Sequence, residues 1–598
     1  MSMRLRRPLA AFLGTVSLVG GAATLPASPA RSAPPPADAQ CPPIEPVGDV
    51  AAGQAVDGLT VSTGTTPEAF TGTVLGTIAD GIAPGLDMIV VRLTSPEIDR
   101  VGGIWEGMSG SPVYGADGRL LGAVSYGLAN GVSPVAGVTP AADMKALLGS
   151  GTGPQAAAGQ RVHAPARLEA RMVDGATTAR EAGSGLETLT VPVAVSGLSG
   201  ARLARASSRL HLGDVRLYRS GPAATAAPAG AASQIVAGGN LAASLSYGDF
   251  SAVGTGTATM VCDGVVVGFG HPFDFAGDTS LTMHGADAIY VQEDPLGVPF
   301  KVSNPTGPVG VVDEDRLAGI EGELGAAPAA TLVRTAVTGP GGRSRTGDTR
   351  VSVPDFAATA TQLGFLANLD RVFDHTGKGS AFVHFTVSGH TAGGTPFTVA
   401  RANRYVDNAD LTFAATEEPA AAVEALVDND FTAVTLDQVR IDASLNDQVR
   451  AYRVGKLQVR AKGRWRTVGA SSVVRVRHGR RITLRVVLTS RRGVLPAKVV
   501  TTHLRVPASA APGETGFVDV GSAGQSAGED SEDGTVEGDA GSPASFGRLI
   551  QALQSAPRND ELSLSLQLES DAEGPAVMRR APVGAVVSGD AQFTVRVR

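Results

Sequence analysis

A serine framed by glycines is the first feature of this sequence with the residue types of a catalytic site. The stretch reads Gly107-Met108-Ser109-Gly110-Ser111-Pro112. Glycine adopts backbone angles that other residues avoid, so such a loop can aim several N–H groups at one point beside the serine hydroxyl. The stretch therefore predicts Ser109 as a nucleophile. The alternative is a plain Gly/Ser turn between two strands.

A histidine between glycine and proline is the second such feature. The β-like run from Thr257 to Gly268 turns at Asp263-Gly264, a dipeptide typical of two-residue hairpin loops. It leads into Gly270-His271-Pro272, where the backbone is fixed and we expect the imidazole to be exposed. His271 is therefore a candidate general base, although a single histidine is more often a surface residue or a satisfied core residue.

Taken together, the two stretches resemble the SpoIVB-type serine peptidases, a chymotrypsin-like family known from spore-forming bacteria. The resemblance rests on the serine loop with its flanking Gly102-Gly103-Ile104 and Gly122-Ala123-Val124, on Gly270-His271-Pro272 with Asp278-Thr279, and on Gly319-Ile320 with Gly322. In that family the histidine unit comes first. Here no histidine precedes His163, so the two half-barrels, within about 58–150 and 236–345, look circularly permuted.

The resemblance implies a chymotrypsin-like double β-barrel with Ser109 as nucleophile and His271 as general base. The N–H groups of Gly107 and Ser109 would then form the oxyanion hole. Because a catalytic triad is defined by geometry and not by chain order, the permutation is compatible with catalysis.

The acid of the triad departs from the family pattern. The family's aspartate lies before the serine in a Thr-Asp-Pro context, where this chain has Thr94-Ser95-Pro96. We choose Asp315, because it follows His271 at a spacing close to that seen in chymotrypsin-like barrels generally. Three other carboxylates stay open, and any of the four is compatible with a solvated turn. They are Asp278, Asp87 and Asp99.

The start of the chain has the pattern of a signal peptide. Residues 1–33 combine a charged start, an apolar middle and small residues at candidate cleavage sites. No later stretch approaches ~20 unbroken apolar residues, so we expect a soluble protein outside the cytoplasm, secreted or associated with the cell envelope. Cys41 and Cys262 can form a disulfide in an oxidising compartment, and two free thiols are the alternative.

Length and composition favour several β-rich domains. A chain of 598 residues predicts about three or four domains. The 76 glycines and 37 prolines, with few aromatic residues, favour sheets joined by many turns. The net charge of -7 argues against a general nucleic-acid binder. The sequence shows no metal-ligand cluster or phosphate-binding loop, so we expect neither a metal nor a cofactor.

The apolar runs and the Gly/Pro/Ala-rich linkers divide the chain into units. The predicted units are a signal peptide (1–33), a Pro/Ala-rich tether (34–57), a serine half-barrel (58–150), a linker with a small β region (151–235), a histidine half-barrel (236–354), an immunoglobulin-like β-sandwich (355–520), an acidic disordered loop (521–545), and a helix with strands that complete the sandwich (546–598). Leu363, Leu366, Leu369 and Val372 are spaced as on one face of a helix and predict a stripe that faces the core. Ser545 is expected to cap the last helix.

A basic segment lies in the predicted sandwich. From Arg450 to Arg492 the chain has fourteen Lys or Arg and no acid. Such a segment can dock on an anionic cell-wall polymer or on lipid headgroups. The alternative is the solvated face of alternating strands.

These features together predict a secreted serine endopeptidase that cleaves protein or peptide substrates through an acyl-enzyme. The alternative is a non-catalytic cell-envelope protein that keeps the barrels as a binding scaffold, because the aspartate expected before the serine is missing. Fold resemblance by itself does not choose between these two functions.

Overall fold

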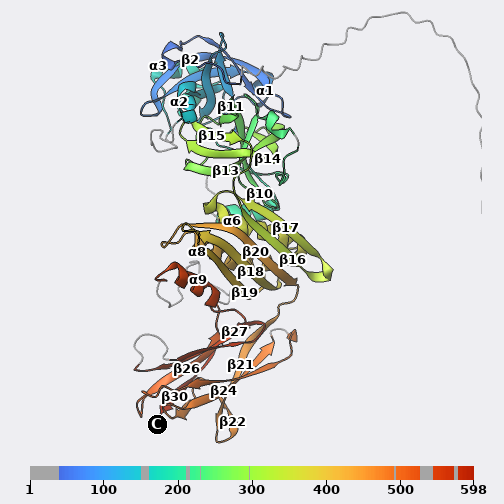
Figure 1. The fold of residues 1–598 in the computed structure, drawn as a ribbon, viewed down its shortest axis with the longest axis vertical. Coiled ribbons are helices and arrows are strands. Elements are labelled where there is room, and N and C mark those ends of the chain that lie inside the picture. Colours follow the sequence, from blue (N-terminus) through green and yellow to red (C-terminus); the bar gives the residue numbers. More distant parts are fainter. Residues whose placement is uncertain are drawn as a thin grey trace, which may run out of the picture.

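The computed structural model describes residues 40–149, 161–174, 176–209, 216–228, 230–294, 297–490, 493–524, 543–570 and 577–598. The chain forms an elongated row of two β-barrels, a sheet covered by helices, and a C-terminal β-sandwich (Figure 1). The predicted signal peptide and most of the acidic loop lie outside the described residues. Within those residues no helix is long and apolar enough to cross a membrane.

The first barrel, called the serine barrel here, consists of antiparallel strands that pair in the cyclic order β1-β2-β3-β6-β5-β4. Pairing of β4 with β5 closes it. Its strands are β1 (Ala55–Thr60), β2 (Glu68–Ala83), β3 (Leu86–Thr94), β4 (Pro112–Gly115), β5 (Leu120–Leu128) and β6 (Val135–Pro140), and its helices are α1 (Pro96–Val101) and α2 (Ala141–Ala146). Alternating apolar residues fill the interior, as expected for a closed sheet.

The second barrel, called the histidine barrel, pairs in the cyclic order β10-β11-β12-β15-β14-β13 and is closed by β10 and β11. Its strands are β10 (Asn240–Gly248), β11 (Ala252–Cys262), β12 (Val265–Gly268), β13 (Gly277–Gln292), β14 (Phe300–Arg316) and β15 (Gly319–Leu324). The predicted hairpin is confirmed, with Asp263 (φ 52°) and Gly264 (φ 90°) both left-handed. Numbered along the chain, the six strands of each barrel pair in the same order.

The connection between the barrels holds more helix than the predicted linker with a small β region. It contains α3 (Ala166–Met172), α4 (Ala179–Ala182), β7 (Leu186–Thr188), β8 (Val193–Val195), α5 (Gly200–Arg209) and β9 (Leu217–Arg219). Strand β7 pairs with β5 of the serine barrel, and β8 pairs with β11 of the histidine barrel. The connection therefore extends the sheets of both barrels.

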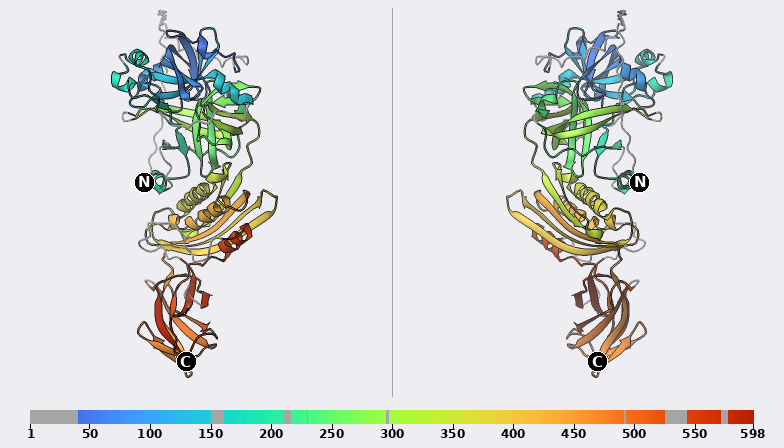
Figure 2. Two further views of the ribbon diagram at one scale, coloured as in Figure 1. Left: turned by 90° about the vertical axis from the view of Figure 1, so that its left-hand side faces the viewer. Right: turned by 90° about the vertical axis from the view of Figure 1, so that its right-hand side faces the viewer.

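A third unit extends the histidine barrel through pairing of β17 with β10. Its strands are β16 (Thr331–Thr338), β17 (Ser344–Val351), β18 (Gly379–Thr391), β19 (Pro396–Asp407) and β20 (Val434–Asn446). Helices α6 (Ala357–Phe373) and α8 (Glu417–Val427) cover the face turned toward the barrels, and the short α7 (Leu411–Ala414) lies between them in sequence (Figure 2).

This unit differs from the prediction that one sandwich begins at residue 355. The helical stripe predicted within α6 is buried, and it covers a sheet that is continuous with the histidine barrel. A long apolar helix needs a sheet face to cover, and that face comes from strands on both sides of the helix in the sequence.

The β-sandwich begins at Ala451 and is made of two sheets, ordered β22-β21-β24-β25 with β29 on β21, and β23-β30-β26-β27-β28. Its strands are β21 (Ala451–Ala461), β22 (Arg464–Val468), β23 (Val473–Val476), β24 (Arg481–Ser490), β25 (Lys498–Arg505), β26 (Thr515–Ser522), β27 (Glu561–Leu568), β28 (Val577–Pro582), β29 (Val586–Ser588) and β30 (Ala591–Val597). Helix α9 (Phe546–Ser555) starts at the predicted cap Ser545 but packs on β19 instead of on the sandwich.

A disulfide joins Cys41 to Cys262, with the two Cα atoms 5.0 Å apart. It ties the segment before β1 to the end of β11, where the amide of Val261 also donates to the carbonyl of Gln40 (2.8 Å). The N-terminal segment of the serine barrel is thereby fixed to the histidine barrel.

We predict that thiol titration of the unfolded, unreduced protein finds no free thiol. Replacement of Cys41 with Ser is expected to lower the free energy of unfolding by about 2–5 kcal/mol, because the bridge restricts a long loop of the unfolded chain. Two titratable thiols per chain would contradict the pairing.

Candidate active site

The serine loop joins the third and fourth strands of the serine barrel, β3 and β4. Gly107 (φ 91°) and Gly110 (φ 93°), on either side of Ser109, have left-handed backbone conformations. Residues other than glycine would be strained in this conformation. Two tight turns shape the loop, since the amide of Met108 donates to Trp105 (3.0 Å) and that of Ser111 donates to Met108 (3.0 Å). The backbone conformation of the loop thus explains why glycines stand on either side of Ser109.

Strand β11 of the histidine barrel holds this loop from the other side. The carbonyl of Ser109 accepts the amide of Thr257 (2.8 Å), and the carbonyl of Gly110 accepts the Thr259 hydroxyl (2.8 Å). The Ser111 hydroxyl donates to Thr60 in β1 (2.9 Å). The position of the serine therefore depends on both barrels.

The histidine loop occupies the equivalent place in its own barrel, between the third and fourth strands β12 and β13. The amide of Phe269 donates to the carbonyl of Thr257 (3.2 Å), so Thr257 binds both loops through its own backbone. The carbonyl of Gly270 accepts the Thr139 hydroxyl of the serine barrel (2.6 Å). Both predicted reactive residues therefore come to one interface between the barrels.

The His271 imidazole is 1% exposed, in contrast to the exposed side chain that we expected. The serine barrel covers this loop, which the sequence of one barrel does not reveal. Nδ1 lies 2.7 Å from the Pro272 carbonyl, which can only accept, so Nδ1 carries the proton of the neutral ring. Nε2 is then the basic nitrogen, as a general base requires.

Ser109 Oγ and His271 Nε2 are not hydrogen-bonded to each other. Both atoms are buried, and neither has a hydrogen-bond partner in the part of the chain that the structure describes. Unpaired buried polar atoms are rare and demand an explanation. Burial also lowers the pKa of His271 to about 4.

Asp315 lies at the end of β14 and does not bond to the imidazole. Its carboxylate accepts backbone amides from the loop that follows the histidine, those of Phe273 (2.7 Å), Asp274 (2.8 Å) and Ala276 (3.1 Å). Burial raises the pKa of Asp315, and these three N–H groups oppose the rise. The structure thus makes Asp315 a support for the histidine loop.

The other carboxylates considered from sequence also have other partners. The contacts are Asp278 with Arg316 (2.5 Å), Asp87 with the amide of Asp80 (2.9 Å) and Asp99 with the Thr94 hydroxyl (3.3 Å). The Pro272 carbonyl therefore takes the place at Nδ1 that an aspartate has in a triad.

The predicted oxyanion-hole donors have no competing acceptor. Within the serine loop the amides of Met108, Gly110 and Ser111 donate to main-chain carbonyls. Those of Gly107 and Ser109 have no acceptor among the residues described. Two unengaged N–H groups on either side of Met108 are what a developing oxyanion would need.

Charged residues beneath the serine loop carried no sequence signal. Lys301 is fully buried, and its Nζ donates to Asn240 (3.0 Å); burial lowers its pKa to about 7. A Cβ added to Gly107 would lie 2.9 Å from the Lys301 Cβ, so the loop rests directly on this strand. Glu106, just before the loop, is paired with Arg216, which also binds Asp294 (2.9 Å).

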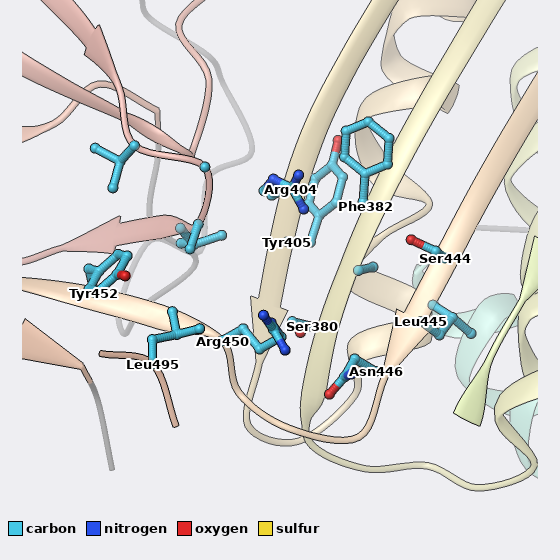
Figure 3. Close-up of a pocket in the computed structure, with 15 residues that line it drawn as sticks. Ser380, Phe382, Arg404, Tyr405, Ser444, Leu445, Asn446, Arg450, Tyr452 and Leu495 are labelled. Carbon is cyan, nitrogen blue, oxygen red and sulfur yellow. The ribbon is translucent and has the colours of Figure 1, made fainter. Parts of the chain in front are cut away.

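A separate hollow of about 550 Å³ lies between the helix-covered sheet and the sandwich (Figure 3). Arg404, Tyr405, Arg450 and Tyr452 line it, and neither Ser109 nor His271 does. Among the described residues no three His, Cys, Asp or Glu side chains gather as a metal site. Comparison of the chain with protein-family models, curated proteins and solved structures finds no match.

We predict that burial of His271 makes the protein acid-sensitive. Its folded pKa of about 4 lies below the ordinary value of 6.5, so the unfolded chain binds the proton more readily between these values. The contribution of His271 to the free energy of unfolding is therefore fully present above pH ~6.5. Between pH ~6.5 and pH ~4 it falls by about 1.4 kcal/mol per pH unit.

The measurement is the free energy of unfolding of wild type and His271→Gln from pH 7 to pH 4. The wild-type curve should fall more steeply than that of the variant. The His384→Gln variant, which changes an exposed histidine of β18, is the control and should follow wild type. Parallel curves for wild type and His271→Gln would contradict the buried neutral imidazole.

Proposed function

We propose that this protein is a secreted serine endopeptidase that resembles the SpoIVB family, with a permuted chymotrypsin-like double barrel. One observation carries the proposal. Ser109 and His271 lie in equivalent loops of two barrels with the same strand order, and both loops are bound to the backbone of Thr257. Catalytic groups contributed by two rigid barrels are held in place better than groups on one mobile loop.

In the proposed mechanism Ser109 Oγ attacks the carbonyl carbon of the scissile peptide while His271 Nε2 accepts its proton. The amides of Gly107 and Ser109 stabilise the oxyanion. The imidazolium then gives the proton to the departing amine, and water hydrolyses the acyl-enzyme with His271 as base again. The two side chains must approach to about 3 Å for the first proton transfer.

Asp315 has a positioning role in this mechanism, since its carboxylate holds the chain after His271 through three amides. The Pro272 carbonyl fixes the tautomer of the imidazole. A carbonyl stabilises an imidazolium less than a carboxylate does, so we expect slower turnover than that of a full triad.

A second candidate function is a non-catalytic envelope scaffold. The burial of Ser109 Oγ and the lack of a carboxylate on the imidazole favour it. The disulfide supports an oxidising, extracytoplasmic location for either function, because such bridges are rare in the cytosol.

We predict that a fluorophosphonate probe labels wild type at Ser109 when the reaction runs to completion, and that Ser109→Ala abolishes labelling without unfolding the protein. The control is Ser388→Ala, a half-buried serine of β18 in the helix-covered sheet, which should label like wild type. Equal labelling of wild type and Ser109→Ala would place the nucleophile at another residue, and absence of labelling in every variant would favour the scaffold function.

We also propose that the sandwich holds the barrels against an anionic surface. Arg460, Arg481, Arg485 and Arg505 lie on the outward face of the sheet β22-β21-β24-β25, opposite its buried apolar face. The Arg485 guanidinium lies 4.1 Å over the Trp465 ring, which keeps it aligned with this face. Three arginines of the basic segment and Arg505 thus lie on one surface.

Replacing Arg460, Arg481 and Arg485 with Gln should weaken binding to phosphatidylglycerol vesicles by about 1 kcal/mol per removed charge and reduce its salt dependence. A soluble polyphosphate tests a polymer instead of lipid. The control replaces Arg334 and Arg440, exposed on the helix-covered sheet, with Gln. Equal binding of all three proteins to both anions would contradict the docking role.

A further inference from the structure

The connection between the barrels passes across the candidate site. Leu189, Val191 and Pro192 are buried between the end of β7 and the start of β8. Ser109 is 0% exposed and His271 1%, so the site is closed to a peptide in this conformation. The segment Leu186–Pro192 is called the strap here.

The strap is bound through its backbone to both barrels. Its first part pairs antiparallel with the end of β5, with Gly127 opposite Glu187, and the amide of Leu189 donates to the carbonyl of Ser125 (2.9 Å). At its other end the Pro192 carbonyl accepts the amide of Thr255 in β11 (3.3 Å). Peptides that add a strand to an exposed sheet edge bind in the same way, through their backbone.

Between these two anchors the strap runs beside both reactive loops. A Cβ added to Gly107 would lie 3.4 Å from the Pro192 ring, and Val191 packs in one cluster with Phe269. The chain from Leu189 to Pro192 therefore contacts the apolar clusters of both barrels and the serine loop.

The Leu189 side chain packs over Gly127 in an apolar slot, and a side chain at position 127 would crowd it. A Cβ added to Gly127 would lie 3.0 Å from the Leu189 Cδ2 and 3.4 Å from the Ile104 Cδ1. Leu189 also belongs to the apolar cluster of Met108, the neighbour of Ser109. Backbone pairing with one side chain in an apolar slot is the combination that gives strand-binding sites affinity and specificity.

We infer that the strap occupies the substrate position of the Ser109 site, and that substrates are extended peptides with a leucine-like side chain where Leu189 lies. This inference rests on the proposed peptidase function and deepens it. A substrate must displace the strap from β5 before its carbonyl reaches Ser109. Displacement also admits water to His271, which makes the imidazole a better base than in the closed site.

The test uses Ser109→Cys, whose sulfur is the single free thiol because Cys41 and Cys262 are bridged. Its alkylation rate with iodoacetamide reports access to the site whether or not the protein is a peptidase. We expect slow alkylation with the strap intact. The second change Leu189→Ala, which empties the slot, or Gly127→Ala, which crowds it, should speed alkylation by about tenfold or more.

The matched control is Glu187→Ala in the same background, because Glu187 lies on the strap without filling the slot. A peptide with the sequence of residues 185–192 should slow alkylation of the Leu189→Ala variant, and a scrambled peptide should not. Each variant is checked for folding by thermal melting. Equal alkylation rates in all variants would contradict the proposal that the strap covers the Ser109 site.

Fluorophosphonate labelling of Leu189→Ala separates the two proposals. Faster alkylation and faster labelling at Ser109 support both. Faster alkylation without any labelling supports the strap as an occupant and contradicts the peptidase. Unchanged alkylation contradicts the proposal that the strap occupies the substrate position, whether or not the probe labels Ser109.

Discussion

The structure of the candidate site depends on the backbone of one buried residue. The amide of Thr257 donates to the carbonyl of Ser109, and the carbonyl of Thr257 accepts the amide of Phe269. The two peptide groups that flank the Thr257 Cα therefore hold both reactive loops. These bonds lie where water is excluded, and leaving one of them unmade costs the full desolvation of a backbone group. The two barrels are therefore locked in register at the one place where their loops must meet.

That lock explains why the site is at once well formed and closed. The loops are held by main-chain bonds, whereas Ser109 Oγ and His271 Nε2 have no partner among the described residues. The strap buries Leu189 and Val191 between the barrels, and its strand β7 lengthens the sheet of the serine barrel. The next strand, β8, lengthens the sheet of the histidine barrel. A neutral imidazole with a depressed pKa is the physical consequence of this covering.

The sequence predicted the local features well because they depend on neighbouring residues. The Asp263-Gly264 turn, the apolar stripe of α6 and the Ser545 cap each need only a few consecutive side chains. The spacing between His271 and Asp315 also identified a carboxylate close to the histidine loop, although it binds amides instead of the imidazole.

Features that need two distant segments were out of reach. No single stretch shows that β17 pairs with β10, that β20 runs parallel to β16, or that Gly127 leaves room for Leu189. Lys301 gave no signal either, because it is buried beneath the serine loop, which belongs to the other barrel. The burial of His271 followed the same rule, because the loop that carries it packs against Ser125 and Thr139 of the other barrel.

Catalysis at Ser109 beneath a displaceable strap is tested by a crystal structure of the protein after reaction with a leucine phosphonate that modifies active-site serines. We expect phosphorus bonded to Ser109 Oγ, an oxygen on the amides of Gly107 and Ser109, the leucine side chain in the slot at Gly127, and the strap displaced. A phosphonate on another residue, or an unmodified Ser109 beneath an unmoved strap after prolonged reaction, would contradict this expectation.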